Sequence, residues 1–206
     1  MGVMVEVEHR KLNMGCGFRK LNDHWNVDIS SKCNPDQVFD FDNTPWPYET
    51  DSFDYITAAN ILEHLGQNPR IFTEIIKEMY RVSTDGAQWF VQFPHHRCDV
   101  AFDDYTHVRM LTEKMFRMWD QKVNYESILK NSADSTYGIY HDVDLEIVNV
   151  DYNVIHIWRD EVESGMLGYG QLNKNLNTLA NVVDTVTLQI KVHKPGRYGE
   201  LVKGYK

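Results

Sequence analysis

The sequence has no long apolar run and no leader of the secretory kind. No uncharged apolar stretch reaches the roughly 18 residues that a membrane-spanning helix needs. The first residues are short of basic charge and are not followed by an apolar segment, as a signal peptide would be. We therefore expect neither a membrane span nor a signal peptide.

Cysteine is scarce. Cys16, Cys33 and Cys98 are odd in number and do not stand in pairs at metal-binding spacing. This usage is typical of reduced thiols in a cytoplasmic protein, which is the location that the sequence predicts.

Positive charge is also in short supply. The 206 residues include 21 Lys and Arg against 30 Asp and Glu, giving a formal net charge of -9. An extended nucleic-acid footprint requires clustered basic residues, so this balance argues against such a partner, although a local basic pocket remains compatible with it. Repeats and low-complexity tracts are absent, and the length predicts a single domain over residues 1–206.

What is present in the first half is an alternation of short apolar runs, turns and one amphipathic helix. Strands are predicted at residues 10–14, 25–29, 37–41, 53–58 and 88–93. Residues 60–65 are predicted to make one or two helical turns. Asn68 and Pro69 then provide a helix cap and a first-turn proline. Apolar residues follow at helical spacing until Asp85 and Gly86 break the pattern.

The second half is less regular. A helix is predicted from Thr112 to Trp119 and a short one at residues 172–179. The β-rich runs 144–154 and 185–193 are predicted to form a closing antiparallel pair at one sheet edge. Strands interleaved with helices are typical of an α/β domain with a mainly parallel sheet.

A glycine turn, Gly15-Cys16-Gly17, follows the first predicted strand. A dinucleotide site would need a further Gly or Ala three residues on, where Lys20 stands, and an acid about 20 residues later. Asp28 comes only eleven residues after Gly17, and residues 18–24 are too few for a crossover helix of roughly ten residues. Without that helix a pyrophosphate loses its binding site. A ligand without phosphate, such as S-adenosylmethionine, needs only a close glycine backbone and a carboxylate for its ribose.

Five segments occur in an order that resembles a known family. They are Leu12–Gly17, Asn26–Ile29, Asp40–Pro47, Asp51–Ile56 running into Asn60–Leu65, and Arg81-Val82 with Asp85-Gly86. Together they resemble class I S-adenosylmethionine-dependent methyltransferases of the broad type-11 kind, over residues 10–94. The resemblance implies a Rossmann-like α/β fold: a mostly parallel seven-stranded sheet with helices on both faces and an antiparallel edge strand.

The resemblance also implies a cofactor site for S-adenosylmethionine. Gly15 and Gly17 would let the backbone pass the methionine part, and Asp28 would hold the ribose hydroxyls. Asp40, with Asp42 as the alternative, would lie near the adenine amino group, and Asn60 near the sulfonium. The remaining cofactor-binding residues of these segments are Asn13, Cys16 and Phe41.

Three positions leave alternatives open. Asn13 stands where the family often has an acid, so recognition of the ammonium would rely on backbone carbonyls. Arg19 follows the turn and would either pair with the cofactor carboxylate or be a solvated surface side chain. Trp46, between two prolines, would either stack near adenine or pack at a rigid turn.

Residues 94–141 are predicted to be an insertion on the acceptor side. His95 follows the fifth strand at the edge where α/β sheets bind ligands, and His107 lies in the stretch Asp104–Arg109. Both are candidate general bases, while the stretch itself would either organise a loop or contact the acceptor. No metal site is predicted, because adjacent histidines such as His95-His96 do not aim at one ion. For Glu63-His64, capping and packing are favoured over catalysis.

The predicted activity is in-line transfer of a methyl group to an oxygen or nitrogen of a small-molecule or sugar acceptor. Proximity and alignment would supply most of the catalysis. The alternatives are a cofactor-binding module or partner subunit without its own turnover, and an NAD-linked oxidoreductase, which Lys20 and the short crossover disfavour. The oligomeric state is left open.

Overall fold

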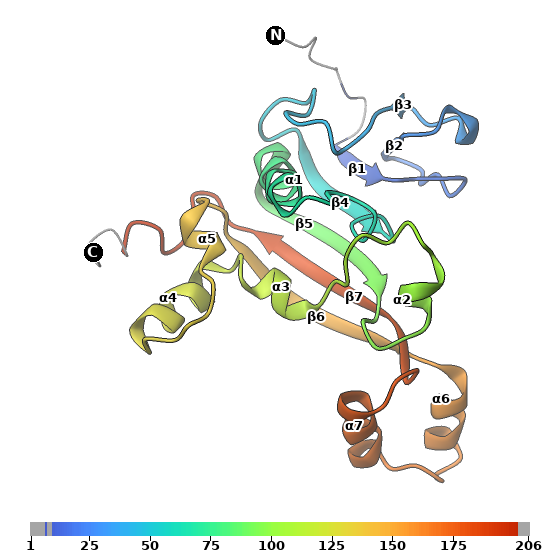
Figure 1. Cartoon of the computed structure of the whole chain (residues 1–206). Helices are drawn as coiled ribbons and strands as arrows, with labels where there is room; N and C mark the ends of the chain where they lie inside the picture. The colour runs from blue at the N-terminus through green and yellow to red at the C-terminus, as the bar shows by residue number, and fades with distance from the viewer. Residues whose placement is uncertain (1–6, 8–9, 202–206) are drawn as a thin grey trace.

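A seven-stranded sheet forms the centre of the protein (Figure 1), in a computed structural model that describes residues 7 and 10–201. Its strands are β1 (Lys11–Met14), β2 (Trp25–Asp28), β3 (Gln37–Val38), β4 (Phe53–Ala59), β5 (Ser83–Pro94), β6 (Leu145–Val154) and β7 (Val183–Val192). They lie in the order β3-β2-β1-β4-β5-β7-β6. The sheet therefore unites strands from both halves of the chain.

The sheet is mostly parallel, as predicted. Strands β1 to β5 pair in parallel with their neighbours. Strand β7 pairs antiparallel with β5 on one side and with β6 on the other. The predicted closing pair is thus confirmed, with the antiparallel strand second from the edge and β6 running in the common direction outside it.

The helices vary widely in length. They are η1 (a 3-10 turn, Ser31–Cys33), α1 (Pro69–Val82), α2 (Val100–Asp103), α3 (Glu113–Arg117), α4 (Gln121–Leu129), α5 (Tyr137–Tyr140), α6 (His156–Glu163) and α7 (Tyr169–Thr178). The predicted cap of α1 is confirmed, since the Asn68 side chain accepts a hydrogen bond of 2.9 Å from the Arg70 amide. Residues 60–65 form turns instead of the predicted helical turns. Within the described ranges, no helix has both the length and the apolar character that crossing a membrane requires.

One face of the sheet carries the core. Helix α1 presents a fully buried apolar side to it, and α1 and α3 lie in front of the sheet in Figure 1. The residues that meet there share zero or near-zero exposure: Ile56, Ala58, Ile75, Ile76, Met79, Val82, Trp89 and Val91. Burial of this apolar surface is the main stabilising contribution in such a layer, at about 25 cal/mol per Å².

The other face is open over β1, β4 and β5. Residues 18–24 form turns without a helix, as their short length predicts, so no crossover helix covers this side. Side chains of these three strands, among them Asn13, Thr57 and Gln92, border a hollow of about 640 Å³ instead. The sequence predicts helices on both faces. Over β1, β4 and β5, the helices of the described residues pack on one face of the sheet (Figure 1).

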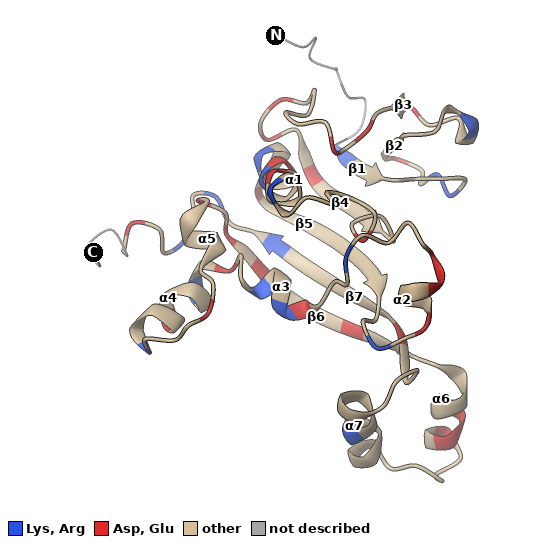
Figure 2. Ribbon diagram, in the orientation of Figure 1, with Lys and Arg blue, Asp and Glu red and all other residues tan. Residues whose placement is uncertain are grey.

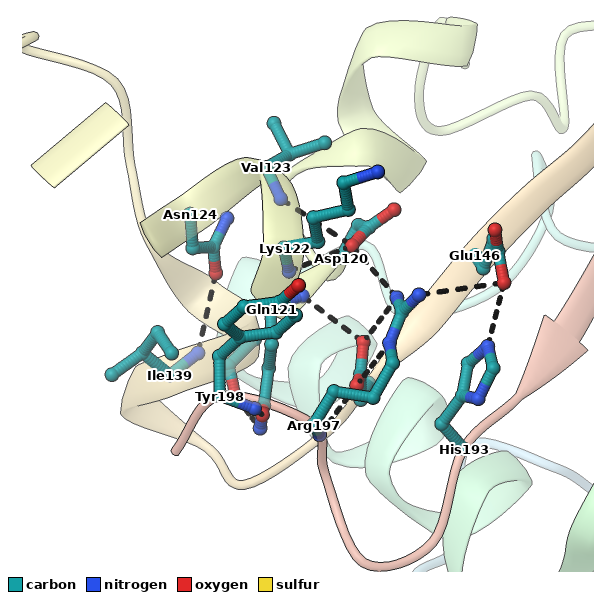
Figure 3. A network of polar contacts seen from close by, with 12 residues as sticks. Asp120, Gln121, Lys122, Val123, Asn124, Ile139, Glu146, His193, Arg197 and Tyr198 are labelled. Carbon is teal, nitrogen blue, oxygen red and sulfur yellow. Dashed lines mark hydrogen bonds and ion pairs between the residues drawn. The ribbon is translucent and has the colours of Figure 1, made fainter. Parts of the chain in front are cut away.

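The segment after β7 ties α4 to the edge of the sheet (Figure 3). The Arg197 guanidinium pairs with Asp144 (Nε to Oδ2, 2.9 Å) and with Asp120 (Nη2 to Oδ1, 2.9 Å). Asp120 also caps α4, where it accepts hydrogen bonds from the Lys122 and Val123 amides. One arginine therefore joins the C-terminal segment, the start of β6 and the start of α4.

Neighbouring residues extend this network. The Gln121 side-chain oxygen accepts a hydrogen bond of 2.9 Å from the Tyr198 amide, and His193 meets Glu146 at 2.7 Å. Asp144 is fully buried, and burial pushes its pKa upward. The hydrogen bonds from Arg197 and from the Gln121 amide outweigh that effect, so the pKa of Asp144 lies below its usual value and the carboxylate stays charged.

Candidate functional site

The predicted glycine turn lies at the carboxyl edge of the sheet, between the ends of β2 and β4. Strand β1 pairs with both, and the Cys16 amide donates to the Val27 carbonyl at 3.0 Å. The Gly17 amide donates a hydrogen bond of 2.9 Å to the Asp28 carboxylate. The structure therefore brings together the turn and the acid that the sequence assigns to the ribose.

The two glycines of the turn meet different surroundings. Both have a positive φ, 61° at Gly15 and 49° at Gly17. A Cβ at Gly15 would lie 2.7 Å from the Ile61 side chain, whereas a Cβ at Gly17 would meet no atom within 4 Å. Gly15 is thus required for packing against the turn after β4. Gly17 is the position that leaves free space beside the backbone, which a closely approaching ligand needs.

Alanine substitutions are expected to separate these two roles. Gly15→Ala adds a clash to the strain of a left-handed backbone, so we expect it to lower the free energy of unfolding by about 3 kcal/mol. Gly17→Ala carries the backbone strain alone, at about 1 kcal/mol. Urea unfolding of both variants measures the difference, and equal losses would contradict the assignment.

Four predicted cofactor residues line the hollow on the open face: Asn13, Gly15, Cys16 and Asn60. Arg19 lines it as well, at the end where the turn lies. The Asn13 side-chain amide already has a partner, since its Nδ2 donates a hydrogen bond of 2.9 Å to the Asn26 side-chain oxygen. Asn60 adopts a left-handed φ of 51° and its backbone amide donates to the Gln92 carbonyl.

The predicted adenine segment is built differently from the turn. Asp40 accepts a hydrogen bond from the Asp42 amide (3.0 Å), and Asp42 accepts one from the Gly66 amide (2.8 Å). Phe41 is buried and its ring contacts Trp46, with 4.9 Å between centroids. The described lining of the hollow contains none of these four side chains. Their carboxylates and rings hold the local backbone, and Trp46 takes the packing role of its two alternatives.

Two apolar side chains at this edge are given no role by the sequence analysis of the site. Phe18 directly follows the glycine turn and is 85% exposed, and Ile29 directly follows Asp28 and is 69% exposed. Large apolar groups at such exposure provide surface that a ligand can cover. Their signal in the sequence is their position, one residue beyond each predicted cofactor contact.

The thiol in the turn is chemically quiet. Cys16 is buried, and burial together with the nearby Cys33 raises its pKa to about 12. A thiol with such a pKa is protonated at neutral pH and is a poor nucleophile. Cys16 therefore contributes its backbone and its volume to the turn.

The two candidate general bases border different hollows. His95 is buried at the end of β5, and it lines a cavity of about 450 Å³ with His96 and Tyr152. Burial and the neighbouring His96 lower the pKa of His95, which favours the neutral, proton-accepting form. His107 lines a second cavity of about 590 Å³, which it shares with Asn60. Of the two candidates, His107 therefore shares a cavity with Asn60, and His95 does not.

The stretch Asp104–Arg109 organises a loop. Asp104 accepts hydrogen bonds from the backbone and the hydroxyl of Thr106. Arg109 donates to the carbonyls of Leu65 and Gly66, and its guanidinium lies 3.9 Å from the centre of the Phe72 ring. Backbone carbonyls are thus the hydrogen-bond partners of Arg109. These contacts hold the loop against the turn after β4.

The backbone is similar to solved methyltransferase structures. A SAM-dependent methyltransferase from Archaeoglobus fulgidus matches with a TM-score of 0.53 at 15% identity, over 89% of this chain and 86% of that protein. The YcgJ protein from Bacillus subtilis gives 0.53 at 12% identity, over 92% and 93%. The [4+2]-cyclase SpnF gives 0.52 at 15% identity, over 90% and 75%.

The chain has the class I methyltransferase fold. This confirms the fold that the resemblance implies. No protein-family model matches the sequence, and no curated protein sequence does either, so the type-11 assignment stays a prediction. One of the three similar structures is named a cyclase, which illustrates that this fold does not by itself determine the reaction.

Proposed function

We propose that this protein is an S-adenosylmethionine-dependent methyltransferase that acts on an oxygen or nitrogen of a small-molecule acceptor. The observation that carries the proposal is the 2.9 Å hydrogen bond between the Gly17 amide and Asp28, beside free space at the carboxyl edge of a class I methyltransferase fold. Ligands of open α/β sheets bind at this edge. The adjoining hollow of about 640 Å³ lies within the size range of small-molecule sites.

The residues present fit this cofactor. Asp28 offers a carboxylate to two ribose hydroxyls, and the open side of Gly17 admits the ligand close to the backbone. Ile29 and Phe18 provide apolar surface at the same edge. Bound S-adenosylmethionine supplies a methyl group that its sulfonium makes labile.

The chain's own residues would align the acceptor and remove its proton. Asn60 borders both the hollow at the glycine turn and the cavity of His107, so it marks where cofactor and acceptor would meet. The acceptor would receive the methyl group from the cofactor, which would keep the electrons of the broken carbon–sulfur bond on its sulfur. The acceptor's proton passes to a nearby base, for which His107 is the better placed candidate. A sugar acceptor and a cytoplasmic location belong to the same proposal.

Thermal unfolding tests the cofactor assignment. We expect S-adenosylhomocysteine at 100 times its dissociation constant to stabilise the protein by about 2.7 kcal/mol and NAD to leave it unchanged. Stabilisation by NAD alone would contradict the proposal. Radiolabelled methyl transfer to small molecules of a cell extract then separates an enzyme from the alternative, a binding module without turnover. Unchanged transfer in both His95→Ala and His107→Ala would remove these histidines as bases.

A further inference from the structure

Glu63, His64 and His107 converge at the carboxyl edge of the sheet. One potential ligand atom from each lies within 4.8 Å of the others. The first two belong to the turn after β4, and the third to the loop after α2. The Glu63 carbonyl accepts a hydrogen bond of 2.9 Å from the Val108 amide, so turn and loop are fixed against each other. The two imidazole rings are 4.6 Å apart and meet edge to face.

The Glu63 side chain is 2% exposed, and neither of its carboxylate oxygens has a hydrogen-bonding partner. Burial raises its pKa to about 7, and the nearby His107 offsets part of that rise. A buried carboxylate without a partner is costly, by about 1–3 kcal/mol for a polar group and more for a charged one. A bound cation would supply the partner that the buried Glu63 carboxylate lacks.

Both histidines are oriented in the same way. His107 Nδ1 lies 2.8 Å from the Ala101 carbonyl, which can only accept, so Nδ1 carries the proton. His64 Nδ1 lies 2.9 Å from the Thr106 hydroxyl, which donates its own hydrogen to Asp104 at 2.6 Å. His64 Nδ1 is therefore the donor there. In each ring Nε2 keeps its lone pair, the state in which histidine binds metals.

We propose that Glu63, His64 and His107 bind a divalent first-row transition-metal ion. Two imidazoles and one carboxylate suit Mn²⁺, Fe²⁺, Co²⁺ or Zn²⁺, whereas Mg²⁺ prefers oxygen ligands throughout. Ligands about 2.1 Å from one ion are at most about 4.2 Å apart, so small side-chain rotations complete the site. The sequence predicts no metal site. The three ligands come from two segments that lie far apart in the sequence, and their spacing along the chain does not reveal that they are close in space.

The surroundings favour a cation. The same cavity of about 590 Å³ is bordered by Asp103 and Asp104, and neither Lys nor Arg is among its described lining residues. Figure 2 shows acidic residues at α2 and in the loop that follows it. Three protein ligands leave coordination positions open, and Asn60 borders the cavity. An acceptor oxygen would bind the ion there. His107 would then hold the ion instead of acting as the base, an extension that rests on the proposed methyl transfer.

Titration of chelator-treated protein with Co²⁺ tests the site, with the visible absorption of the bound ion as readout. We expect one equivalent to bind the unmodified protein. Glu63→Gln and His107→Ala should each weaken binding more than about 100-fold, because loss of a direct ligand exceeds the 10–100-fold effect of an outer partner. Glu63→Gln removes an unpaired buried charge, so this variant is expected to fold.

Two further variants give the test its controls. Thr106→Val removes the acceptor of the His64 Nδ1 proton and should weaken binding about tenfold, while Thr106→Ser restores it. His156→Ala changes an exposed histidine outside the cluster and should bind like the unmodified protein. Absence of saturable binding, unchanged binding in Glu63→Gln, or binding of Mg²⁺ in preference to Co²⁺ would overturn the proposal. Stabilisation by S-adenosylhomocysteine, measured on the same variants, reports separately on the proposed function.

Discussion

Replacing Arg197 by alanine is expected to lower the free energy of unfolding by about 3 kcal/mol. The substitution leaves the Asp144 carboxylate without its cation, and this carboxylate is fully buried. Removing one partner of a buried ion pair costs about 3–5 kcal/mol. The 24% exposure of the Arg197 side chain places the expected loss at the lower end. Urea unfolding at neutral pH measures it.

The matched control is Arg117→Ala. This arginine pairs with Glu113 on the surface of α3, where its side chain is 45% exposed. Exposed pairs contribute about 0–1 kcal/mol, so the loss should be small. Losses of similar size in the two variants would show that the Arg197 network does not stabilise the fold.

Lowering the pH should reduce the difference in unfolding free energy between the unmodified protein and Arg197→Ala. Hydrogen bonds from Arg197 outweigh the effect of burial and depress the pKa of Asp144. A depressed pKa stabilises the fold above the unfolded value of about 3.9, and this contribution is lost as the pH falls further. In the variant, burial acts without Arg197 and raises the same pKa. The gap in unfolding free energy should therefore be largest near neutral pH and shrink as the pH falls through the raised pKa of the variant toward the depressed pKa of the unmodified protein.

Asp28→Ala is expected to weaken S-adenosylhomocysteine binding about 100-fold. Hydrogen bonds to charged groups contribute about 1.5–3 kcal/mol each, and Asp28 would accept two from the ribose. The same carboxylate accepts hydrogen bonds from the Gly17 and Ser30 amides, so the variant also loosens the turn. Isothermal titration calorimetry measures the affinity.

Two comparisons sharpen that result. Asp54→Ala removes an exposed carboxylate of β4 that pairs with Arg10, and it should leave the affinity unchanged. Asp28→Asn keeps the size and one carbonyl oxygen, and it should fall between the other two variants. An affinity that Asp28→Ala leaves intact would place the ribose elsewhere.

Local signals in the sequence predicted much of the fold. Asn68 and Pro69 mark the start of α1. Residues 18–24 are too few for a crossover helix, and they form turns. Helices α4 and α5 were not predicted from the sequence, because they depend on contacts between residues that are distant along the chain, such as Asp120 and Arg197. Strand β5 begins at Ser83, earlier than predicted. Its pairing with β4 shifts register between Phe53 and Tyr55, so the residues around Gly86 form an irregularity within the strand and do not end it.

The candidate site divides in the same way. The glycine turn and Asp28 are close in sequence, and the motif predicts their proximity. Phe41 belongs to a segment that carries the resemblance, yet its ring is buried against Trp46, because a motif specifies the path of the backbone and not the direction of each side chain. The cluster of Glu63 and His107 joins residues 44 positions apart. Only the packing of the loop on the turn after β4 brings them together.

The position of β7 has a consequence for how the protein is made on the ribosome. Strand β7 follows the other six described strands in the sequence, yet it lies between β5 and β6. Until it emerges, β6 has no neighbour in the sheet, and Asp144 has no Arg197 to neutralise it. A nascent chain that ends before residue 183 therefore holds β1 to β5 with the edge of β5 unpaired. The sheet cannot close until β7 has been made, and chaperones that shield strand edges would act during that interval.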